Sequence, residues 1–419
     1  MLDFFAQIVA TFYSTWFIVT PIVFWLIFKS LWGRHVFIAD FLMKQNDVLL
    51  EIIPPRDIEK SPRVMEAFFE SVAATDAGVN KISQYCHGAG NPYFSFEIVG
   101  TEGVAHFYIR TPAAFRDHIE SALYAQYPAV EIIEVNDYVY EIPQVIPNKE
   151  WTMRGFALTL LKEDAYPIKT YKYFEEEVTG KMIDPLASIL EHISTLGPGQ
   201  HMWLQYIVRA DRPTWFNDWG KGAVDEFLGK ASKPTGVFAN IIYDIKDVFG
   251  GILTGWHAPP EFSSLEAPNG SDDQPVEFRL TPGEKQTLKA LEENISKNMF
   301  SVTSRLLVIG KRDFFSGANI TGLMTSIKQF ADNNTNQLIP VDRAKIYADY
   351  VKVKSRRAYR ARVLLRRYRD RDDSGGHSFH FSTEELATVF HLPDMSVESP
   401  AVQWSDSRRG SAPSNLPFK

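Results

Sequence analysis

The runs YFSFEIV (Tyr93 to Val99) and VAHFYIR (Val104 to Arg110) flank the connection Gly100-Thr-Glu-Gly103. Each run alternates with a period of two, which is typical of a β-strand with one buried face. A short connection that contains glycine predicts a β-hairpin between the two runs. We take this hairpin as the centre of the fold, because the segments before and after it can be assigned relative to it.

A strand and a helix are expected on each side of the hairpin. Before it, Asp47 to Ile53 reads as a strand, and Ser61 to Ala74 places apolar residues at helical spacing. After it, Ala113 to Tyr127 carries an apolar helical face, and Val130 to Val135 is a last strand. The order βαββαβ is that of the ferredoxin-like split unit.

A second, weaker copy of this order follows. Its expected strands and helices are, in chain order, Gly155 to Leu161, Asp184 to Leu196, Gln200 to Val208, Phe300 to Gly310, Gly317 to Ala331 and Arg362 to Arg369. An insertion at about residues 210–298 separates the middle strands, with helices expected at Gly222 to Leu228 and Pro282 to Lys297. After the second copy, Ser382-Thr-Glu-Glu385 predicts a short helix that begins with a capping box.

The N-terminal stretch Phe4 to Phe28 contains no Asp, Glu, Lys or Arg over 25 residues. About 20 apolar residues span the hydrocarbon core of a bilayer, so we expect an uncleaved transmembrane helix here. Lys29, Arg34 and Lys44 follow the stretch, whereas no Lys or Arg precedes it. The positive-inside rule then places the remainder of the chain in the cytoplasm.

The predicted fold class is therefore α+β, with an N-terminal transmembrane helix followed by two ferredoxin-like (βαββαβ) modules, the second with a large insertion. The domains that we expect are a transmembrane anchor at residues 1–34, a first module at 35–140, a second module at 150–371 and, at 372–419, a short helix with an extended tail. With 45% hydrophobic and 23% charged residues, the composition is that of an ordinary globular chain.

The sequence contains no pattern that predicts catalysis, a cofactor or a metal. Neither Gly229-Lys230 nor Gly310-Lys311 has the spacing of a phosphate-binding loop, and the nucleophile motif G-x-S-x-G is absent. The single cysteine excludes an intramolecular disulfide. Cys86-His87 supplies two of the about four ligands that zinc takes, and His377 with His380 lacks a third. We therefore expect a protein that is not an enzyme.

Residues Lys352 to Arg371 form a basic stripe, with ten Lys and Arg against Asp370 alone, in a chain of net charge −7. Such a contrast is informative about partners, not about fold. With Tyr359 and Tyr368 between them, these cations could neutralise the phosphates of nucleic acid or of anionic lipid. There are two alternatives for the basic stripe. It could contact an acidic protein, or it could be a strand that its charges keep exposed to solvent. The candidate contact residues are Lys352, Lys354, Arg356, Arg357, Arg360, Arg362, Arg366, Arg367, Arg369 and Arg371.

Five aromatic residues in and after the second copy could stack on nucleic-acid bases, namely Trp203, Tyr206, Trp215, Phe216 and Trp219. In a chain with 13% aromatic residues, packing in the core is the more common use of such rings. We expect these side chains to pack in the core.

Four further stretches are HFYIRTPAAFRDHIESALYAQYP at His106 to Pro128, DPLASILEHISTLGPGQHMWLQ at Asp184 to Gln205, NITGLMTSIKQF at Asn319 to Phe330 and FSTEELATVFHLP at Phe381 to Pro393. They resemble the membrane-anchored N-terminal region, a domain of unknown function, that precedes type IV secretion-like and conjugation-type DNA-translocating ATPases of candidate-phyla bacteria. The final SNLP, Ser414 to Pro417, is similar to the junction before the ATPase domain. The sequence stops at that junction.

The resemblance implies a single-pass module of the bacterial inner membrane that positions a motor at an export channel. Its implied partners are the lipid bilayer, a separate P-loop ATPase, DNA and further copies of the chain. We therefore expect a non-catalytic adaptor that docks a P-loop ATPase and DNA in a type IV secretion-like or conjugation-like apparatus. The alternatives are a membrane-tethered scaffold or lipid-binding module unrelated to transport and, third, an enzyme of unrecognised type.

Overall fold

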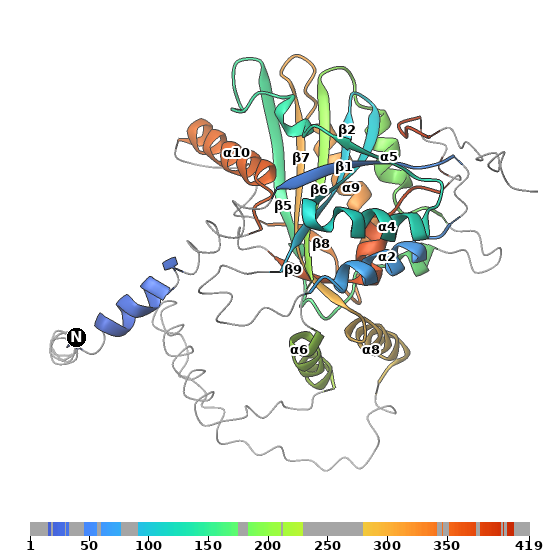
Figure 1. Cartoon of the computed structure of the whole chain (residues 1–419). Helices are drawn as coiled ribbons and strands as arrows, with labels where there is room; N and C mark the ends of the chain where they lie inside the picture. Colours follow the sequence, from blue (N-terminus) through green and yellow to red (C-terminus); the bar gives the residue numbers. More distant parts are fainter. Residues whose placement is uncertain are drawn as a thin grey trace, which may run out of the picture. The chain divides into compact units, whose positions relative to one another are not determined.

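The computed structural model describes residues 16–17, 20–29, 31–32, 46–56, 60–76, 91–174, 183–210, 213–228, 280–341, 346, 352–373, 378–394, 397 and 400–405. The chain divides into two compact units, one of residues 1–213 with 297–419 and the other of residues 214–296. In the described part of the first unit, nine strands form one antiparallel sheet (Figure 1). The fold is of the α+β class, as expected.

The first half of the sheet is built from β1 (Asp47–Ile53), α2 (Arg63–Ala73), β2 (Tyr93–Thr101), β3 (Val104–Pro112), α4 (Arg116–Gln126) and β4 (Glu131–Val135). Its strands lie in the order β4-β1-β3-β2, and each neighbouring pair is antiparallel. This is the arrangement of a ferredoxin-like βαββαβ unit. In the β2–β3 turn, Glu102 and Gly103 have positive φ angles of 52° and 94°, which are typical of a two-residue hairpin connection.

The second half is built from β5 (Trp151–Leu160), α5 (Ala187–Ser194), β6 (Gln200–Ala210), β7 (Met299–Lys311), α9 (Ala318–Ile327) and β8 (Leu338–Pro340). Its strands lie in the order β6-β7-β5-β8, again antiparallel. If the four strands of each half are numbered 1 to 4 along the chain, the first half has the order 4-1-3-2 across the sheet. The second half has the same order, read from the opposite edge. The connections contain the 3-10 helices η2 (Ala113–Phe115), η3 (Tyr138–Tyr140), η4 (Tyr171–Phe174) and η6 (Lys328–Phe330).

The two copies share one sheet because β2 pairs with β6. The pairing is antiparallel and extends from Tyr93, opposite Arg209, to Thr101, opposite His201. Both strands are buried along nearly their whole length, as central strands covered on both faces are. The two modules are therefore joined by main-chain hydrogen bonds.

Different helices cover the two faces of the sheet. One face packs against α2, α4, α5 and α9 and against α11 (Thr383–Val389), in a core that includes Phe68, Phe96 and Leu190 (Figure 1). The other face has a smaller core around Trp203 and Tyr368. This second core is covered by η3 and by α10 (Val353–Arg369).

The segment that follows α10 also enters the first core. β9 (Phe379–Ser382) pairs with β7, and α11 begins at the predicted capping box of Ser382 and Glu385. All residues of α11 are buried, and Val402 forms a β-bridge with Ala105 of β3. The described residues between 378 and 405 are thus an integral part of the sheet unit.

Residues 214–296 form the second unit, which falls within the segment predicted as an insertion at about residues 210–298. It contains α8 (Pro282–Ile295) and all but the first residue of α6 (Pro213–Phe227). α8 begins with a capping box of Thr281 and Glu284 and has Pro282 at its first position, both of which favour a helix start.

The predicted transmembrane helix is the first correction to the expected fold. Among the described residues, no helix is both long and apolar enough to cross a lipid bilayer, so that part of the predicted fold class is wrong. Residues 16–17, 20–29 and 31–32 are helical. Residues 4–15 and 18–19 of the predicted helix lie outside the described residues.

The predicted last strand of the second module, Arg362 to Arg369, is the second correction, because these residues belong to α10. The buried residues Ala361, Leu364, Leu365 and Tyr368 recur at helical spacing, a pattern that a period-two interpretation of this segment overlooks. β8 takes the place of that strand beside β5.

Candidate functional site

α10 carries most of the predicted basic stripe. The seam of α10, which we define as Ala361, Leu364, Leu365 and Tyr368, is buried against the sheet. Towards the other end of the helix, residues 352–360 are all exposed or half-buried. α10 is therefore attached to the sheet through its C-terminal half, and the face opposite the seam is turned away from the sheet (Figure 1).

The structure distributes the ten candidate residues over three environments. The exposed residues are Lys352, Lys354, Arg356, Arg362 and Arg366. The half-buried residues are Arg357, Arg360, Arg367 and Arg369, and Arg371 is buried. Residues three, four and seven apart share one face of a helix. Arg362 and Arg366 therefore form one outward stripe with Tyr359, whose side chain is 68% exposed.

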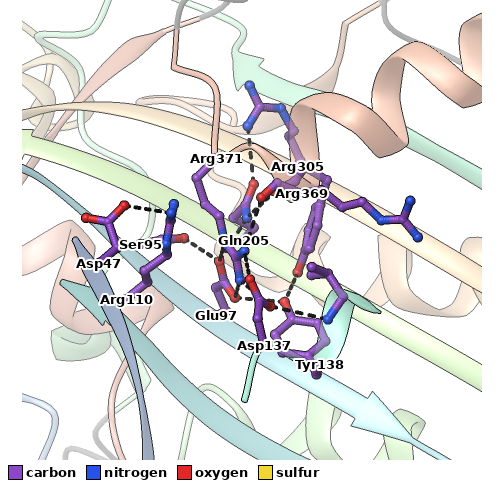
Figure 2. A network of polar contacts seen from close by, with 12 residues as sticks. Asp47, Ser95, Glu97, Arg110, Asp137, Tyr138, Gln205, Arg305, Arg369 and Arg371 are labelled. Carbon is purple, nitrogen blue, oxygen red and sulfur yellow. Dashed lines mark hydrogen bonds and ion pairs between the residues drawn. The ribbon is translucent and has the colours of Figure 1, made fainter. Parts of the chain in front are cut away.

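Arg371, just after α10, is committed to a buried ion pair. It donates from Nε to Oε1 of Glu97 over 3.0 Å and from Nη2 to Oε2 over 3.2 Å. It also donates from Nη2 to Oδ1 of Asp137 over 3.0 Å. Figure 2 shows Arg371 reaching both carboxylates, which come from β2 and from the segment before η3. This bidentate geometry is the strong form of an arginine–carboxylate contact.

The backbone at this point has the geometry of a Schellman helix ending. The amide of Arg371 donates to the carbonyl of Tyr368, and the amide of Asp372 donates to that of Arg367. Arg371 has a φ of 46°, at the position where glycine is usual. The left-handed backbone conformation is unfavourable for residues that carry a Cβ atom. The ion pair therefore holds Arg371 in a backbone conformation that it would otherwise avoid.

Glu97 belongs to a row of polar residues that crosses the sheet. The row consists of Glu51, Tyr108, Glu97, Gln205 and Arg305, which lie opposite one another on β1, β3, β2, β6 and β7. Gln205 donates from Nε2 to Oε1 of Glu97 over 2.9 Å, and Arg305 donates from Nη1 to Oε1 of Gln205 over 3.2 Å (Figure 2). Arg305 also donates to the carbonyl of Asp372. These contacts connect three central strands to the end of α10.

Two buried tyrosine hydroxyls complete the surroundings of Glu97. The hydroxyl of Tyr138 donates to Oε2 of Glu97 over 2.7 Å and lies 2.7 Å from the hydroxyl of Tyr368. Burial raises the pKa of both tyrosines well above the usual value, so both remain protonated. Because the hydroxyl of Tyr138 donates its only hydrogen to Glu97, the hydrogen bond between the two tyrosines is donated by Tyr368.

The pKa of Glu97 reflects a balance between burial and its partners. Burial raises the pKa, because it disfavours the charged form. The charge of Arg371 and the hydrogen bonds from Arg371, Ser95 and Gln205 outweigh burial and lower the pKa to about 2. Glu97 is thus charged at neutral pH and neutralises Arg371. Arg371 is therefore structural, and is not available to a ligand.

Arg369 is likewise engaged within the molecule. Its guanidinium donates to the carbonyls of Ile142, Pro143 and Gln144, over 3.4, 2.9 and 2.8 Å. These contacts fix the segment after η3 beside the C-terminal end of α10. The candidate contact surface consequently narrows to the exposed residues of α10 and its N-terminal flank.

A hollow of about 570 Å³ lies along α10 beside the outward stripe, since Tyr359 lines it whereas Arg362 and Arg366 do not. Among the described residues, its lining includes the cations Lys352, Arg356, Arg360 and Arg367 together with Tyr359. Four cations around one hollow suit an anionic group, and phosphate groups are the anions that arginine clusters commonly recognise.

Metal binding finds no support in the described part of the chain, where no group of three or more His, Cys, Asp or Glu side chains could hold a metal ion. Nδ1 of His380 lies 2.8 Å from Oδ2 of Asp164. Cys86, His87 and His377 lie outside the described residues.

Residues 39–405 match a family model that is described as a domain of unknown function, DUF8128. The chain belongs to the DUF8128 family. The match spans everything from β1 to α11, so α10 and its buried partners lie in the part of the chain that defines the DUF8128 domain. No curated protein matches the chain.

Sequence reasoning missed the polar partners that fix α10 in this DUF8128 chain. A signal was nonetheless present, since Glu97 and Arg305 are the charged residues of the otherwise uncharged runs YFSFEIV and VTSRLLVIG. A charge in a buried strand requires a partner of opposite charge. The sequence does not reveal that the partner of Glu97 is Arg371, which lies 274 residues further along the chain.

The aromatic residues that were expected to pack in the core of the DUF8128 domain do so where the structure describes them. Trp203 and Tyr206 are 1% and 0% exposed. The side chains of Trp215, Phe216 and Trp219 lie outside the described set. Of the two tyrosines in the basic stripe, Tyr368 is buried and Tyr359 is exposed.

Proposed function

We propose that this chain is a non-catalytic adaptor that holds nucleic acid on α10 within a type IV secretion-like or conjugation-like transport apparatus. The observation that supports the proposal best is the outward stripe of α10, where Arg362 and Arg366 are exposed opposite the seam. A row of exposed cations on one rigid helix can neutralise neighbouring phosphates and release their counterions.

The charge pattern of α10 favours a ligand over a purely structural role. Arg362 and Arg366 are like charges four residues apart, an arrangement that destabilises a helix by about 0.2–0.5 kcal/mol. Val353–Arg369 contains no Asp or Glu that could offset this repulsion within the helix. A bound polyanion would remove the repulsion.

Binding to a short fluorescently labelled DNA duplex, measured by anisotropy at low salt, tests this proposal. The variant Arg362→Gln with Arg366→Gln should bind about tenfold more weakly than the wild type, because two phosphate contacts are lost. The matched control is Arg63→Gln with Lys328→Gln, which removes two exposed cations from α2 and η6. The control should bind as the wild type does.

Two results would contradict nucleic-acid binding by α10, namely no DNA binding by the wild type and equal binding by the two double variants. If the wild type binds vesicles of anionic lipid but not DNA, the lipid-binding alternative is favoured instead.

The adaptor role is supported by the resemblance of the chain to the N-terminal region of type IV secretion-like DNA-translocating ATPases. It requires a separate P-loop ATPase as a partner, for which a neighbouring gene is the first candidate. Affinity purification of the tagged chain, with and without that gene, should recover the ATPase only when the gene is present. Absence of the ATPase from the purified material would remove the docking role and would leave DNA binding by α10 to its own test.

A further inference from the structure

Tyr359 differs from the other tyrosine of the basic stripe in its surroundings. Its side chain is 68% exposed, and it stands three residues before Arg362 and seven before Arg366, on the same face of α10. Tyr368, by contrast, is fully buried in the seam, and its hydroxyl lies 2.7 Å from that of Tyr138. Only Tyr359 of this pair can offer a ring face to a ligand.

A second exposed tyrosine lies near the other end of α10. Tyr140 of η3 is also 68% exposed. The hydrogen bonds from Arg369 to the carbonyls of residues 142–144 keep the segment after η3 beside the end of the helix. Burial lowers the pKa of Arg369, and interactions with Tyr140, Asp137 and Asp370 partly offset this effect.

Tyr359 lies on the N-terminal side of the outward cations, and the segment that follows Tyr140 is held beside Arg369 on their C-terminal side. Ten residues separate Tyr359 from Arg369 along the helix, a rise of about 15 Å. Arg362 and Arg366 lie between these two points on the exposed side. Tyr359 also borders the hollow that Lys352, Arg356 and Arg360 line, so cations lie on both sides of its ring along the helix.

We propose that α10 binds single-stranded nucleic acid in preference to a duplex, with bases stacked on Tyr359 and Tyr140 and phosphates on Arg362 and Arg366. This inference rests on the proposed nucleic-acid function and specifies its ligand. In a duplex the base faces are stacked inside the helix and only the base edges reach the grooves. An exposed ring gains from stacking when it meets the free base faces of a single strand.

The geometry of α10 also favours a single strand. The C-terminal half of the helix is fixed flat against the sheet by Leu364, Leu365 and Tyr368. A helix held in this way presents one cationic stripe with flanking rings, which is the combination by which proteins bind single strands without sequence preference.

The experiment compares the affinities for an oligodeoxythymidylate and for a duplex of the same length, measured by anisotropy with the full chain. The wild type should bind the single strand more tightly. Tyr359→Leu should weaken single-strand binding by at least about fivefold, since stacking is lost, and should change duplex binding by less than about twofold. Tyr359→Phe keeps the ring and should bind as the wild type does.

Tyr173→Leu is the matched control, because Tyr173 of η4 is 61% exposed and belongs to the segment that contacts α11 on the other face of the sheet. This variant should bind both ligands as the wild type does. An oligouridylate of the same length shows whether the 2′-hydroxyl matters, and similar affinity for DNA and RNA is expected of binding by stacking and phosphate contacts.

The outcomes separate this inference from the function on which it rests. Equal wild-type affinity for single strand and duplex, or a Tyr359→Leu variant that keeps its single-strand affinity, would overturn the stacking model and leave nucleic-acid binding in place. Equal losses in Tyr359→Leu and Tyr173→Leu would also overturn it. Failure to bind either ligand would overturn both.

Discussion

Glu97 and Arg371 form an ion pair that folding removes almost completely from water, with side-chain exposures of 0% and 1%. Removal of Arg371 leaves the charge of Glu97 without its ion-pair partner in the interior, and removal of Glu97 leaves Arg371 with Asp137 as its remaining carboxylate. We expect Glu97→Gln and Arg371→Gln each to lower the free energy of unfolding by about 3–5 kcal/mol, as measured by urea denaturation. The double variant should be more stable than the sum of the two losses predicts. Losses below about 1 kcal/mol in the single variants would show that the pair is not a main attachment of α10.

The pH dependence of stability provides a second test of Glu97. Its pKa falls from an ordinary value of 4.5 to about 2 on folding. A carboxyl group with a depressed pKa stabilises the fold above its ordinary pKa, and this contribution disappears as the pH falls through the folded value. Between pH 4.5 and pH 2 the wild type should therefore lose stability that the variant Glu97→Gln with Arg371→Gln does not lose. Denaturation curves recorded across this range would contradict the prediction if both proteins lost stability in parallel.

At the scale of the element, α10 should be sensitive to change on one face and tolerant on the other. Leu365 is 1% exposed, and Leu365→Ala should cost about 2–5 kcal/mol of unfolding free energy. Arg362→Ala on the exposed face should change it by no more than about 0.5 kcal/mol. Thermal or urea denaturation followed by circular dichroism measures both. Similar costs for the two variants would be inconsistent with the observed orientation of the helix.

α10 also shows where local sequence patterns stop being sufficient. In RVLLRRYR, the apolar residues Val363 and Leu365 fit a strand period, whereas Leu364, Leu365 and Tyr368 fit a helix. Eight cations in Val353–Arg369 are compatible with either structure. The apolar face of the sheet around Trp203 and Leu307 selects the helix, and this surface is assembled from segments that are remote in the sequence.

At the scale of the whole molecule, the shared sheet predicts cooperative behaviour across both modules. β2 and β6 are central and paired with each other, so their amides should exchange with deuterium only on global unfolding. We expect similarly slow exchange in both strands, measured by mass spectrometry. Faster exchange is expected in α8, which belongs to the separate unit of residues 214–296. Exchange of β2 and β6 at clearly different rates would contradict a single cooperative sheet.

The sequence predicted the strands within each copy better than the joining of the copies. Alternation and turn residues are local, so the hairpin around Gly100-Thr-Glu-Gly103 and the run Phe300 to Gly310 could be located from them. The pairing of β2 with β6 depends on two strands far apart in the chain. The nearly continuous apolar run from His201 to Val208 did carry a hint, since such runs indicate strands buried on both faces.

The salt dependence of DNA affinity tests most directly whether the outward cations of α10 bind phosphates. The logarithm of the association constant should fall linearly with the logarithm of salt concentration, by about 0.9 for each phosphate contact. The variant Arg362→Gln with Arg366→Gln is predicted to have a slope that is shallower by about 1.8 than that of the wild type, whereas Arg63→Gln with Lys328→Gln keeps the wild-type slope. Equal slopes for all three proteins would contradict a nucleic-acid interface on α10.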